Sequence, residues 1–285
     1  MSIKFNDVSF YYEKKKKGLN IPAISHIDLE IKEQDEFVMI IGHTGSGKST
    51  LLSHINGLLI PSEGSLDVLD FKITNKKRNN PKLKKLRQRI GYVFQFPEYQ
   101  LFDETVLKDM AYAPKNFGLS LEEAVKSAKE AAKQLGITDL LDKSPFELSG
   151  GQMRKVAIGG ILAYNPEIYL LDEPTRGLDP VGAKETIEFF NHLHKDFHKT
   201  MIMITHDMNL VYEYATRVIV LDGGKIIFDG KKEVFFQTKY QELGFSKPDV
   251  LKAIDMINEK LHYNLPCEIY NLEQLVEYLE VNDHE

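Results

Sequence analysis

Short apolar runs recur along the chain, separated by longer segments of mixed polarity. Each run is only long enough for one strand that is buried on both faces of a sheet. The runs occupy residues 36–41, 168–171, 200–205 and 217–221. Because helix-compatible segments lie between them, the pattern predicts an α/β fold with a parallel sheet. An Asp-Gly-Gly turn at 222–224 predicts that the last run returns as a hairpin over residues 225–228.

A second pattern, strict alternation of apolar and polar positions, marks the N-terminal region. It covers residues 3–10 and 27–31 and predicts half-buried strands. Lysines 14–17 lie between the two strand-like segments and predict the solvated tip of a hairpin. Further along, Ser120 and Glu123 have the spacing of a capping box for a helix that runs through Leu135 and ends at Gly136.

Beyond Gly230 the pattern becomes helical, which divides the chain into a main domain, 1–230, and a C-terminal extension, 231–285. Asn271 is placed to cap a final helix. The apolar positions of that helix recur at i, i+3, i+4 and i+7, at Leu272, Leu275, Val276 and Leu279. Such a stripe faces either its own domain, which we favour, or a partner chain.

Composition places the chain among soluble globular proteins, with 42% hydrophobic and 27% charged residues in 285. No run is long enough to span a bilayer, and the N-terminus lacks a signal-peptide core. The one cysteine, Cys267, cannot form an internal disulfide, and we expect it to be a buried small side chain.

A net charge of −6 argues against bulk affinity for nucleic acid. We interpret a basic cluster as a solvated surface rather than as a contact with lipid or nucleic acid. The cluster comprises Lys76, Lys77, Arg78, Lys82, Lys84, Lys85 and Arg87.

The most specific motif is Gly42-His43-Thr44-Gly45-Ser46-Gly47-Lys48-Ser49, which matches G-x-x-x-x-G-K-[ST]. It follows the apolar run 36–41 and opens a helix-like segment that Gly57 can end. In that context backbone N–H groups and the helix N-terminus converge on phosphate oxygens. We expect Lys48 to reach the β- and γ-phosphates and Ser49 to ligate Mg²⁺. A chance match in a glycine-rich turn would not have this strand–loop–helix setting.

Two further motifs add chemistry. Asp172 and Glu173 follow a buried strand, where Asp172 can share Mg²⁺ with Ser49 and Glu173 can orient or deprotonate a water. A solvated turn is the alternative interpretation of two such acids alone. Ser149, with Gly150, Gly151 and Gln152 after it, predicts a second anion site at a helix N-terminus. One chain that binds one triphosphate needs one such site, so this site is expected to close on the nucleotide of another subunit.

These motifs together resemble the ATP-binding-cassette (ABC) family over residues 3 to about 230. The resemblance implies a P-loop NTPase nucleotide-binding domain: a RecA-like core, an antiparallel β subdomain and an α-helical subdomain at about 95–165. It also implies that the chain is an ATPase using ATP and Mg²⁺. In this family an aromatic stacks on adenine, which here is Tyr12, with Tyr11 as the alternative.

The resemblance implies roles for the remaining site residues one by one. Residues Gly42, His43, Thr44, Gly45, Ser46, Gly47, Lys48, Ser49 and Thr50 resemble the phosphate loop. Gln95 resembles the glutamine that contacts Mg²⁺ and water. Residues Ser149, Gly150, Gly151 and Gln152 resemble the signature that caps the opposite nucleotide. Leu178-Asp179 resembles the segment that communicates across a dimer, and His206 the histidine that contacts the γ-phosphate. The implied catalytic set is Lys48, Gln95, Glu173 and His206, and the implied metal ligands are Ser49, Gln95 and Asp172.

A narrower resemblance, carried by residues 94–106, is to the ATPases of energy-coupling factor (ECF) transporters, and specifically to the second member of the usual pair. It implies an importer of a vitamin or metal ion at the cytoplasmic face of a prokaryotic membrane. The implied partners are a second ABC ATPase, a transmembrane coupling subunit that docks near residues 95–109, and a separate substrate-binding membrane subunit. We favour a homologous, non-identical second ATPase over a homodimer, with the extension aiding the pairing.

Residue-level expectations for the partner contacts follow from the same resemblance. The carboxylates of Glu98, Asp103, Glu104 and Asp109 are candidates for pairing with a partner arginine, or they form a solvated acidic loop. Arg176 stands where the family usually has a small residue, and we expect it to alter the contact with the other ATPase while leaving catalysis intact.

Three alternatives compete with this interpretation. Another class of ABC transporter would share most of the motifs. A soluble ABC ATPase of DNA repair is disfavoured because only about 54 residues separate Gln95 from Ser149, too few for a long coiled-coil insertion. Translation factors of the family usually carry two cassettes. A scaffold without activity conflicts with the complete catalytic set.

Overall fold

The computed structural model describes residues 2–12, 21–32, 36–75, 80–261, 265–266 and 269–282. The lysines at 14–17, the basic residues 76–78 and Cys267 lie outside these ranges, and the side chain of Lys82 is also not described. Within the described part, no helix has both the length and the apolar character needed to cross a bilayer.

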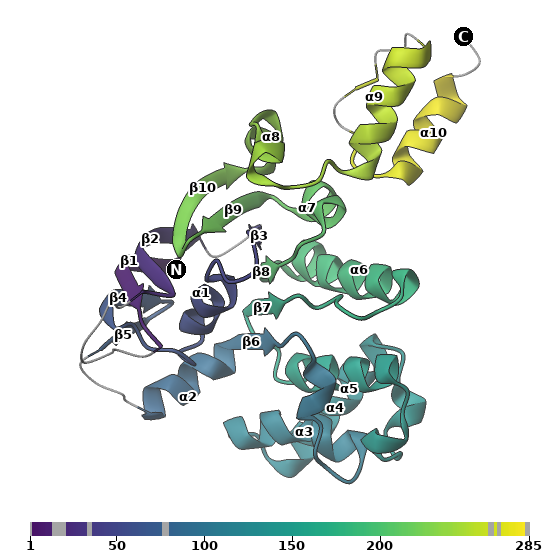
Figure 1. Cartoon of the computed structure of the whole chain (residues 1–285). Coiled ribbons are helices and arrows are strands. Elements are labelled where there is room, and N and C mark those ends of the chain that lie inside the picture. The colour runs from purple at the N-terminus through teal and green to yellow at the C-terminus, as the bar shows by residue number, and fades with distance from the viewer. Residues whose placement is uncertain are drawn as a thin grey trace.

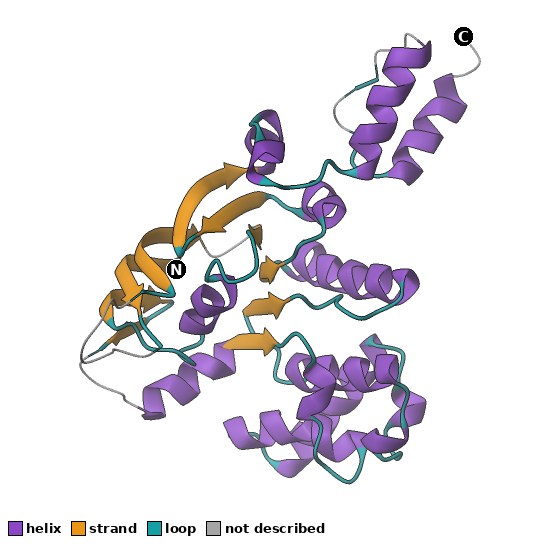
Figure 2. Ribbon diagram, viewed as in Figure 1, coloured by secondary structure: helices purple, strands orange, loops and turns teal. Residues whose placement is uncertain are grey.

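The centre of the molecule is a six-stranded sheet (Figures 1 and 2). Its strands stand in the order β10-β9-β3-β8-β7-β6, and all pairs are parallel except the β9–β10 hairpin. The strands are β3 (Phe37–Ile41), β6 (Ile90–Val93), β7 (Ile168–Asp172), β8 (Thr200–Ile204), β9 (Arg217–Asp222) and β10 (Lys225–Lys231). The apolar runs therefore form the predicted parallel sheet, and β6 is an additional strand that they do not include.

The central strands are buried on both faces because helices or a second sheet cover each side. Along β3, Phe37 and Met39 contribute to one apolar core and Val38 and Ile40 to the other. The first core packs against α6 (Pro180–Phe197) and α7 (Met208–Tyr214), and the second against α1 (Lys48–Ile55). With every position of β3 buried, only the loops at the strand ends remain available for chemistry.

The N-terminal strands form a separate antiparallel sheet with strand order β2-β1-β4-β5. They are β1 (Ser2–Phe10), β2 (Ile24–Lys32), β4 (Glu63–Val68) and β5 (Phe71–Thr74). The predicted alternation of β1 is interrupted at Asp7, which has a φ of 47° and lies at a register shift in the pairing with β2. The bulge explains why Phe5 and Val8, three residues apart, are both buried.

A block of helices follows β6, at the bottom of Figure 1. It comprises α3 (Val106–Phe117), α4 (Leu121–Gln134) and α5 (Gly150–Leu162), preceded by a 3₁₀ turn, η1 (Pro97–Gln100). The capping box predicted at Ser120 and Glu123 is present at the start of α4, and Gly136 follows its end with a φ of 66°. Helix α2 (Asn80–Arg89) precedes β6, and two further 3₁₀ turns are η2 (Thr138–Leu140) and η3 (Pro145–Glu147).

The C-terminal region begins inside the main core. Phe235 of α8 (Lys232–Gln237) and Tyr240 of the turn η4 (Tyr240–Leu243) pack with the central strands, so the core continues past the boundary expected at residue 230. Helices α9 (Asp249–Leu261) and α10 (Leu272–Asn282) then form a small separate cluster with Tyr212 of α7. Asn271 caps α10 as predicted, since its Oδ1 accepts a hydrogen bond from Gln274 N at 2.9 Å.

Candidate functional site

The loop between β3 and α1 has a backbone that two glycines make possible. Gly42 has a φ of 147°, and a Cβ there would lie 2.1 Å from the carbonyl oxygen of Leu221. Gly47 has a φ of 102° and directly precedes α1, whose first turn has no side-chain cap. The free N–H groups at the start of α1 therefore face outward from a narrow loop, as an anion site requires.

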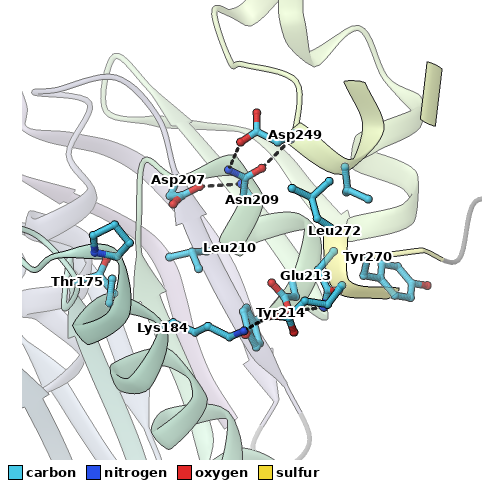
Figure 3. Close-up of a pocket in the computed structure, with 15 residues that line it drawn as sticks. Thr175, Lys184, Asp207, Asn209, Leu210, Glu213, Tyr214, Asp249, Tyr270 and Leu272 are labelled. Carbon is cyan, nitrogen blue, oxygen red and sulfur yellow. Dashed lines mark hydrogen bonds and ion pairs between the residues drawn. The ribbon is translucent and has the colours of Figure 1, made fainter. Parts of the chain in front are cut away.

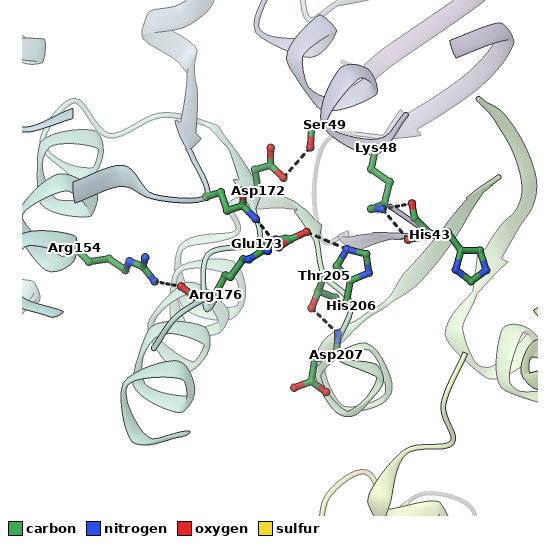
Figure 4. Close-up of polar contacts among 12 residues, drawn as sticks. His43, Lys48, Ser49, Arg154, Asp172, Glu173, Arg176, Thr205, His206 and Asp207 are labelled. Carbon is green, nitrogen blue, oxygen red and sulfur yellow. Dashed lines mark hydrogen bonds and ion pairs between the residues drawn. The ribbon is translucent and has the colours of Figure 1, made fainter. Parts of the chain in front are cut away.

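Lys48 is held by this loop. Its Nζ donates to the carbonyl oxygens of Gly42 at 2.7 Å and His43 at 2.8 Å (Figure 4). Burial lowers the pKa of Lys48, while the nearby charges of Glu173 and Asp172 act in the opposite direction. An ammonium group has three donors, so one remains for a phosphate oxygen.

Ser49 and Asp172 meet although 123 positions separate them in the sequence. Ser49 Oγ donates to Asp172 Oδ1 at 3.2 Å, and Tyr92 Oη of β6 donates to Asp172 Oδ2 at 3.2 Å. Burial raises the pKa of Asp172, and these two hydrogen bonds oppose the rise. A hydroxyl and a carboxylate that share one point are oxygen ligands of the kind Mg²⁺ takes together with substrate phosphates.

Glu173 is the most connected side chain of the site. Its Oε2 accepts hydrogen bonds from Gln95 Nε2 and from Arg176 Nη1, each at 2.8 Å. His206 Nε2 lies 3.0 Å from Oε1 (Figure 4). Burial raises the pKa of Glu173, but the bonds from Arg176 and Gln95 and the charge of His206 outweigh it, so the pKa lies below its ordinary value. The backbone of Glu173 is in the left-handed region, with a φ of 49°.

Most of these residues line one cavity of about 350 Å³, although Asp172 and Tyr92 are not among its lining residues. It is lined by Tyr12, Ala23, Thr44, Gly45, Gly47, Lys48, Ser49, Thr50, Gln95, Glu173, Arg176 and His206. Tyr12 stands at its edge, where its Oη lies 2.9 Å from Thr50 Oγ1, and its ring is largely exposed. Tyr11 is not among the lining residues. The cavity therefore unites the predicted aromatic, the phosphate loop and the residues after β6, β7 and β8.

Two expected site residues point elsewhere. The imidazole of His43 turns away from Lys48 (Figure 4). Its Nε2 lies 3.0 Å from the carbonyl oxygen of Leu243, and the ring stacks against Phe245. Only the backbone of His43 faces Lys48. The Oγ of Ser46 is buried without a hydrogen-bond partner among the described residues, and Ser46 is not among the residues that line the cavity.

The Ser149–Gln152 motif forms a helix start and is absent from the residues that line this cavity. Ser149 Oγ accepts from Gln152 N, and Gln152 Oε1 accepts from Ser149 N, so the pair forms a capping box at α5. A Cβ at Gly150 or Gly151 would meet no atom within 4 Å. The motif is thus an open helix N-terminus that does not line the nucleotide cavity of its own chain.

The four carboxylates after Gln95 were candidates either for a partner arginine or for a solvated loop, and three of them are engaged within the chain. Glu98 forms a two-point ion pair with the buried Arg154, at 3.0 and 3.1 Å. Asp109 Oδ2 accepts from the backbone N–H groups of Phe102 and Asp103. Glu104 pairs with Lys108 on the surface. Burial of Arg154 requires a charge partner, and Glu98 supplies it.

The sequence did not predict the contacts that three residues make at this site. Tyr92 supports Asp172, Arg176 contacts Glu173, and Arg154 donates to the carbonyl oxygens of Pro174 and Arg176 at 3.4 and 2.7 Å. Arg154 follows Gln152 by two residues, so its place on the helix that starts at the Ser149 motif was visible in the sequence. Its partners in the loop after β7 were not, because they are tertiary contacts.

A second cavity, of about 500 Å³, lies between the main core and the C-terminal helices (Figure 3). Asn209 and Asp249 close one side of it with reciprocal hydrogen bonds of 3.1 and 2.7 Å. Lys184 of α6 pairs with Glu273 of α10 on the other side. Thr175 and Asp207, which belong to the loops around Glu173, also line this cavity. No residue of the phosphate loop lines it.

Comparison with known proteins agrees with this geometry. The family model described as ABC transporter matches residues 24–176. The ATP-binding protein EcfA2 of the energy-coupling factor transporter of Ligilactobacillus salivarius is 52% identical over 238 residues, 82% of this chain and 81% of that protein. The EcfA2 of Clostridium perfringens is 44% identical over 283 residues, 98% of this chain and 97% of that protein.

Solved structures agree on the fold. The cbiO1 protein of Clostridium perfringens, described as part of the ABC transporter complex cbiONQ, has a TM-score of 0.73 and 31% identity, with 98% of each chain covered. The cassette MJ0796, in a dimeric post-hydrolysis state bound to ADP and Pi, has a TM-score of 0.71 and 34% identity, covering 81% of this chain and 98% of that one. The predicted ABC nucleotide-binding fold is confirmed.

The motifs, the cavity that unites them and the near full-length relatives lead to one assignment. The chain belongs to the ABC transporter family, and within it to the ATP-hydrolysing subunits of energy-coupling factor importers.

Proposed function

We propose that this ATPase works at the cytoplasmic face of a prokaryotic membrane as one of two ABC subunits that sandwich two Mg-ATP molecules. Each nucleotide lies between the phosphate loop of one subunit and the Ser149-type motif of the other. Closure of the pair, driven by tighter ATP binding in the closed state, moves a membrane coupling subunit and leads to uptake of a vitamin or metal ion. The imported solute binds a separate membrane subunit and does not contact this chain.

The observation that carries this proposal is the meeting of Lys48, Glu173 and His206 around one cavity, with the Ser149 motif outside it. Tyr12 is placed to stack on adenine, and Lys48 to bind the β- and γ-phosphates. Glu173 accepts the proton of a water whose oxygen attacks the γ-phosphorus while the bond to the β-phosphate oxygen breaks. General base catalysis of this kind contributes roughly 10²–10⁴-fold to the rate.

The remaining polar groups assist the reaction. Ser49, Asp172 and Gln95 would hold Mg²⁺, which neutralises phosphate charge when it is bound. Tyr92 keeps Asp172 turned toward Ser49 through its 3.2 Å hydrogen bond. His206 is placed to contact the γ-phosphate from the end of β8. These roles agree with the cavity lining and with the donors and acceptors present there.

A surface for the coupling subunit is supported by aromatic side chains that stay exposed between β6 and the middle of α3. Phe96 and Tyr99 lie 5.9 Å apart between ring centroids, and Phe102 and Tyr112 lie 4.8 Å apart. Tyr99 is 84% exposed. Exposed aromatics beside charged groups are typical of protein interfaces, where they become buried anchors. We name these four residues the aromatic surface.

The test is recovery of the tagged, full-length protein from detergent-solubilised native membranes, followed by mass spectrometry. The wild type should retain a second ABC ATPase and a polytopic membrane protein. The double variant Tyr99→Ala with Phe102→Ala should lose the membrane protein and keep the second ATPase, because neither side chain lines the nucleotide cavity.

Phe197→Ala is the matched control, since Phe197 is an exposed aromatic at the end of α6, outside the aromatic surface. It should retain both partners. Recovery of the wild type without any membrane protein would contradict the transporter proposal. Full retention of the membrane protein by the double variant would contradict the docking surface alone.

A further inference from the structure

Arg176 occupies a fixed position beside Glu173. Its backbone N–H donates to the carbonyl oxygen of Glu173 at 3.1 Å, which closes a turn. Its own carbonyl oxygen accepts a hydrogen bond from the buried Arg154 at 2.7 Å. The turn and this anchor direct the side chain of Arg176 back over Glu173, and the ion pair of 2.8 Å results.

The hydrogen-bonding capacity of Glu173 is largely used in this arrangement. A carboxylate oxygen has two lone-pair sites. On Oε2 both are taken, one by Gln95 Nε2 and one by Arg176 Nη1. Oε1 faces His206, with one site left. A carboxylate that is to accept a proton from water needs a free, correctly directed lone pair, and in this arrangement only the second site of Oε1 offers one.

The three partners of Glu173 are not equivalent. In the proposed function Gln95 turns to Mg²⁺ and His206 to the γ-phosphate, which frees both from Glu173. Arg176 has no contact with the nucleotide or with Mg²⁺ in that proposal. Its side chain is 57% exposed and lies at the rim of the cavity, while Glu173 is 16% exposed beneath it. Arg176 is therefore the partner that stays on the carboxylate when a nucleotide is bound.

We propose that Arg176 is a positioning residue that holds the Glu173 carboxylate through Oε2 and thereby slows ATP hydrolysis. The inference rests on the proposed role of Glu173 as the base. A hydrogen bond from a cation to a carboxylate is stronger than a neutral one, so it must be weakened as the carboxylate takes up a proton. Because the guanidinium is more than half exposed, its effect is modest, about two- to fivefold in rate. The position thus acts on the rate of catalysis, not only on the contact between subunits.

The experiment is steady-state ATP hydrolysis by the full-length protein in the complex recovered from membranes, with kcat and KM determined separately. Arg176→Ala should raise kcat about two- to fivefold and leave KM within about twofold. Arg176→Lys, which keeps the charge, should restore a kcat near that of the wild type. Lys252→Ala is the matched control, because Lys252 forms an ion pair of the same i,i+3 spacing and 2.8 Å length with Asp249, and neither residue lines the nucleotide cavity.

The variant Glu173→Gln tests the role of Glu173 as the base separately from the role of Arg176. It should reduce turnover by at least about 10²-fold, and the double variant with Arg176→Ala should be no faster, because Arg176 acts through Glu173. Normal hydrolysis by Glu173→Gln would overturn the role of the base and the inference with it. If Glu173→Gln is inactive but Arg176→Ala has an unchanged or reduced kcat, only the inference on Arg176 fails. A large rise of KM in Arg176→Ala would also overturn it, since Arg176 would then bind the nucleotide.

Discussion

At the scale of single residues, His54 is a titratable group whose pKa the fold lowers strongly. It is fully buried in α1, its Nδ1 donates to the carbonyl oxygen of Thr50 at 2.7 Å, and its ring meets the edge of Phe10. Burial lowers the pKa of His54 from 6.5 to about 4. The neutral form is therefore the one that fits the core behind the phosphate loop.

This predicts a pH dependence of stability with a definite sign. Between pH 6.5 and about pH 4 the unfolded chain binds a proton at His54 that the folded chain does not. Stability from this group is complete above that window and is lost as the pH falls through it. Going from pH 7 to pH 5, the wild type should lose about 2 kcal/mol more unfolding free energy than His54→Leu.

Urea titrations of both proteins at the two pH values measure this difference, and the other histidines and carboxylates cancel in the comparison. Equal losses in the two proteins would mean that His54 is protonated in the fold.

Among single residues, the sequence predicted best those for which one motif specifies both the residue type and the backbone conformation. Gly42, Lys48 and Ser49 fall into that class, because the loop cannot form its close contact with Leu221 without glycine. Arg176 shows the limit. Its departure from the family pattern was visible, but not its contact with Glu173, since an exposed arginine can reach many acceptors and only tertiary geometry selects one.

At the scale of elements, the ion pair of Arg154 and Glu98 joins three segments of the chain. Arg154 comes from the first turns of α5, Glu98 from η1, and the carbonyl oxygens of Pro174 and Arg176 from the loop after β7. Both charged side chains are largely buried. Such a pair adds less to stability than its geometry suggests, but breaking it is costly because a charge then stays buried alone.

Glu98→Ala should therefore lower the free energy of unfolding by about 3 kcal/mol. Glu104→Ala removes a carboxylate from the same loop, but its pair with Lys108 is exposed, and this variant should unfold at the same urea concentration as the wild type. Chemical denaturation of the two variants side by side makes the comparison. A Glu98→Ala protein as stable as Glu104→Ala would show that Arg154 finds water or another acceptor.

Among elements, the strongly patterned ones were predicted and the weakly patterned ones were not. The apolar runs became β3, β7, β8 and β9, and the capping box marked the start of α4. Strand β6 has only four residues and one of them is a glycine, so it lacked a pattern that separates it from the adjoining helix. Its assignment depends on pairing with β7, which is a contact across the fold.

At the scale of the whole molecule, helix α10 divides its apolar stripe between two environments. Leu275 is 4% exposed within the small C-terminal cluster, whereas Val276 is 53% exposed and Leu272 is also exposed. The prediction that the stripe faces its own domain thus holds for Leu275 and for Leu279, which packs against the same cluster, while Leu272 borders the cavity toward the main core. Val276 remains on the surface, and we expect it to contact a partner subunit.

Val276→Glu should weaken pairing with the second ATPase and leave the free energy of unfolding within about 0.5 kcal/mol of the wild type. Leu275→Glu, one residue earlier, should instead unfold the C-terminal helices. Size-exclusion chromatography with light scattering reports the pairing, and circular dichroism reports the helices. Undiminished pairing of Val276→Glu would place the dimer contact elsewhere on the chain.

The contact of His43 with the segment after η4 has a consequence for how this protein can be shortened. Leu243 follows His43 by 200 positions, yet one hydrogen bond of 3.0 Å joins them. A chain cut after Gly230 would look complete by its motifs, but it would lose Phe235 and Tyr240 from the main core and the support of Phe245 behind the phosphate loop. The smallest chain that retains an intact nucleotide site therefore ends after Phe245, and the helices beyond it are the part that can be removed or exchanged.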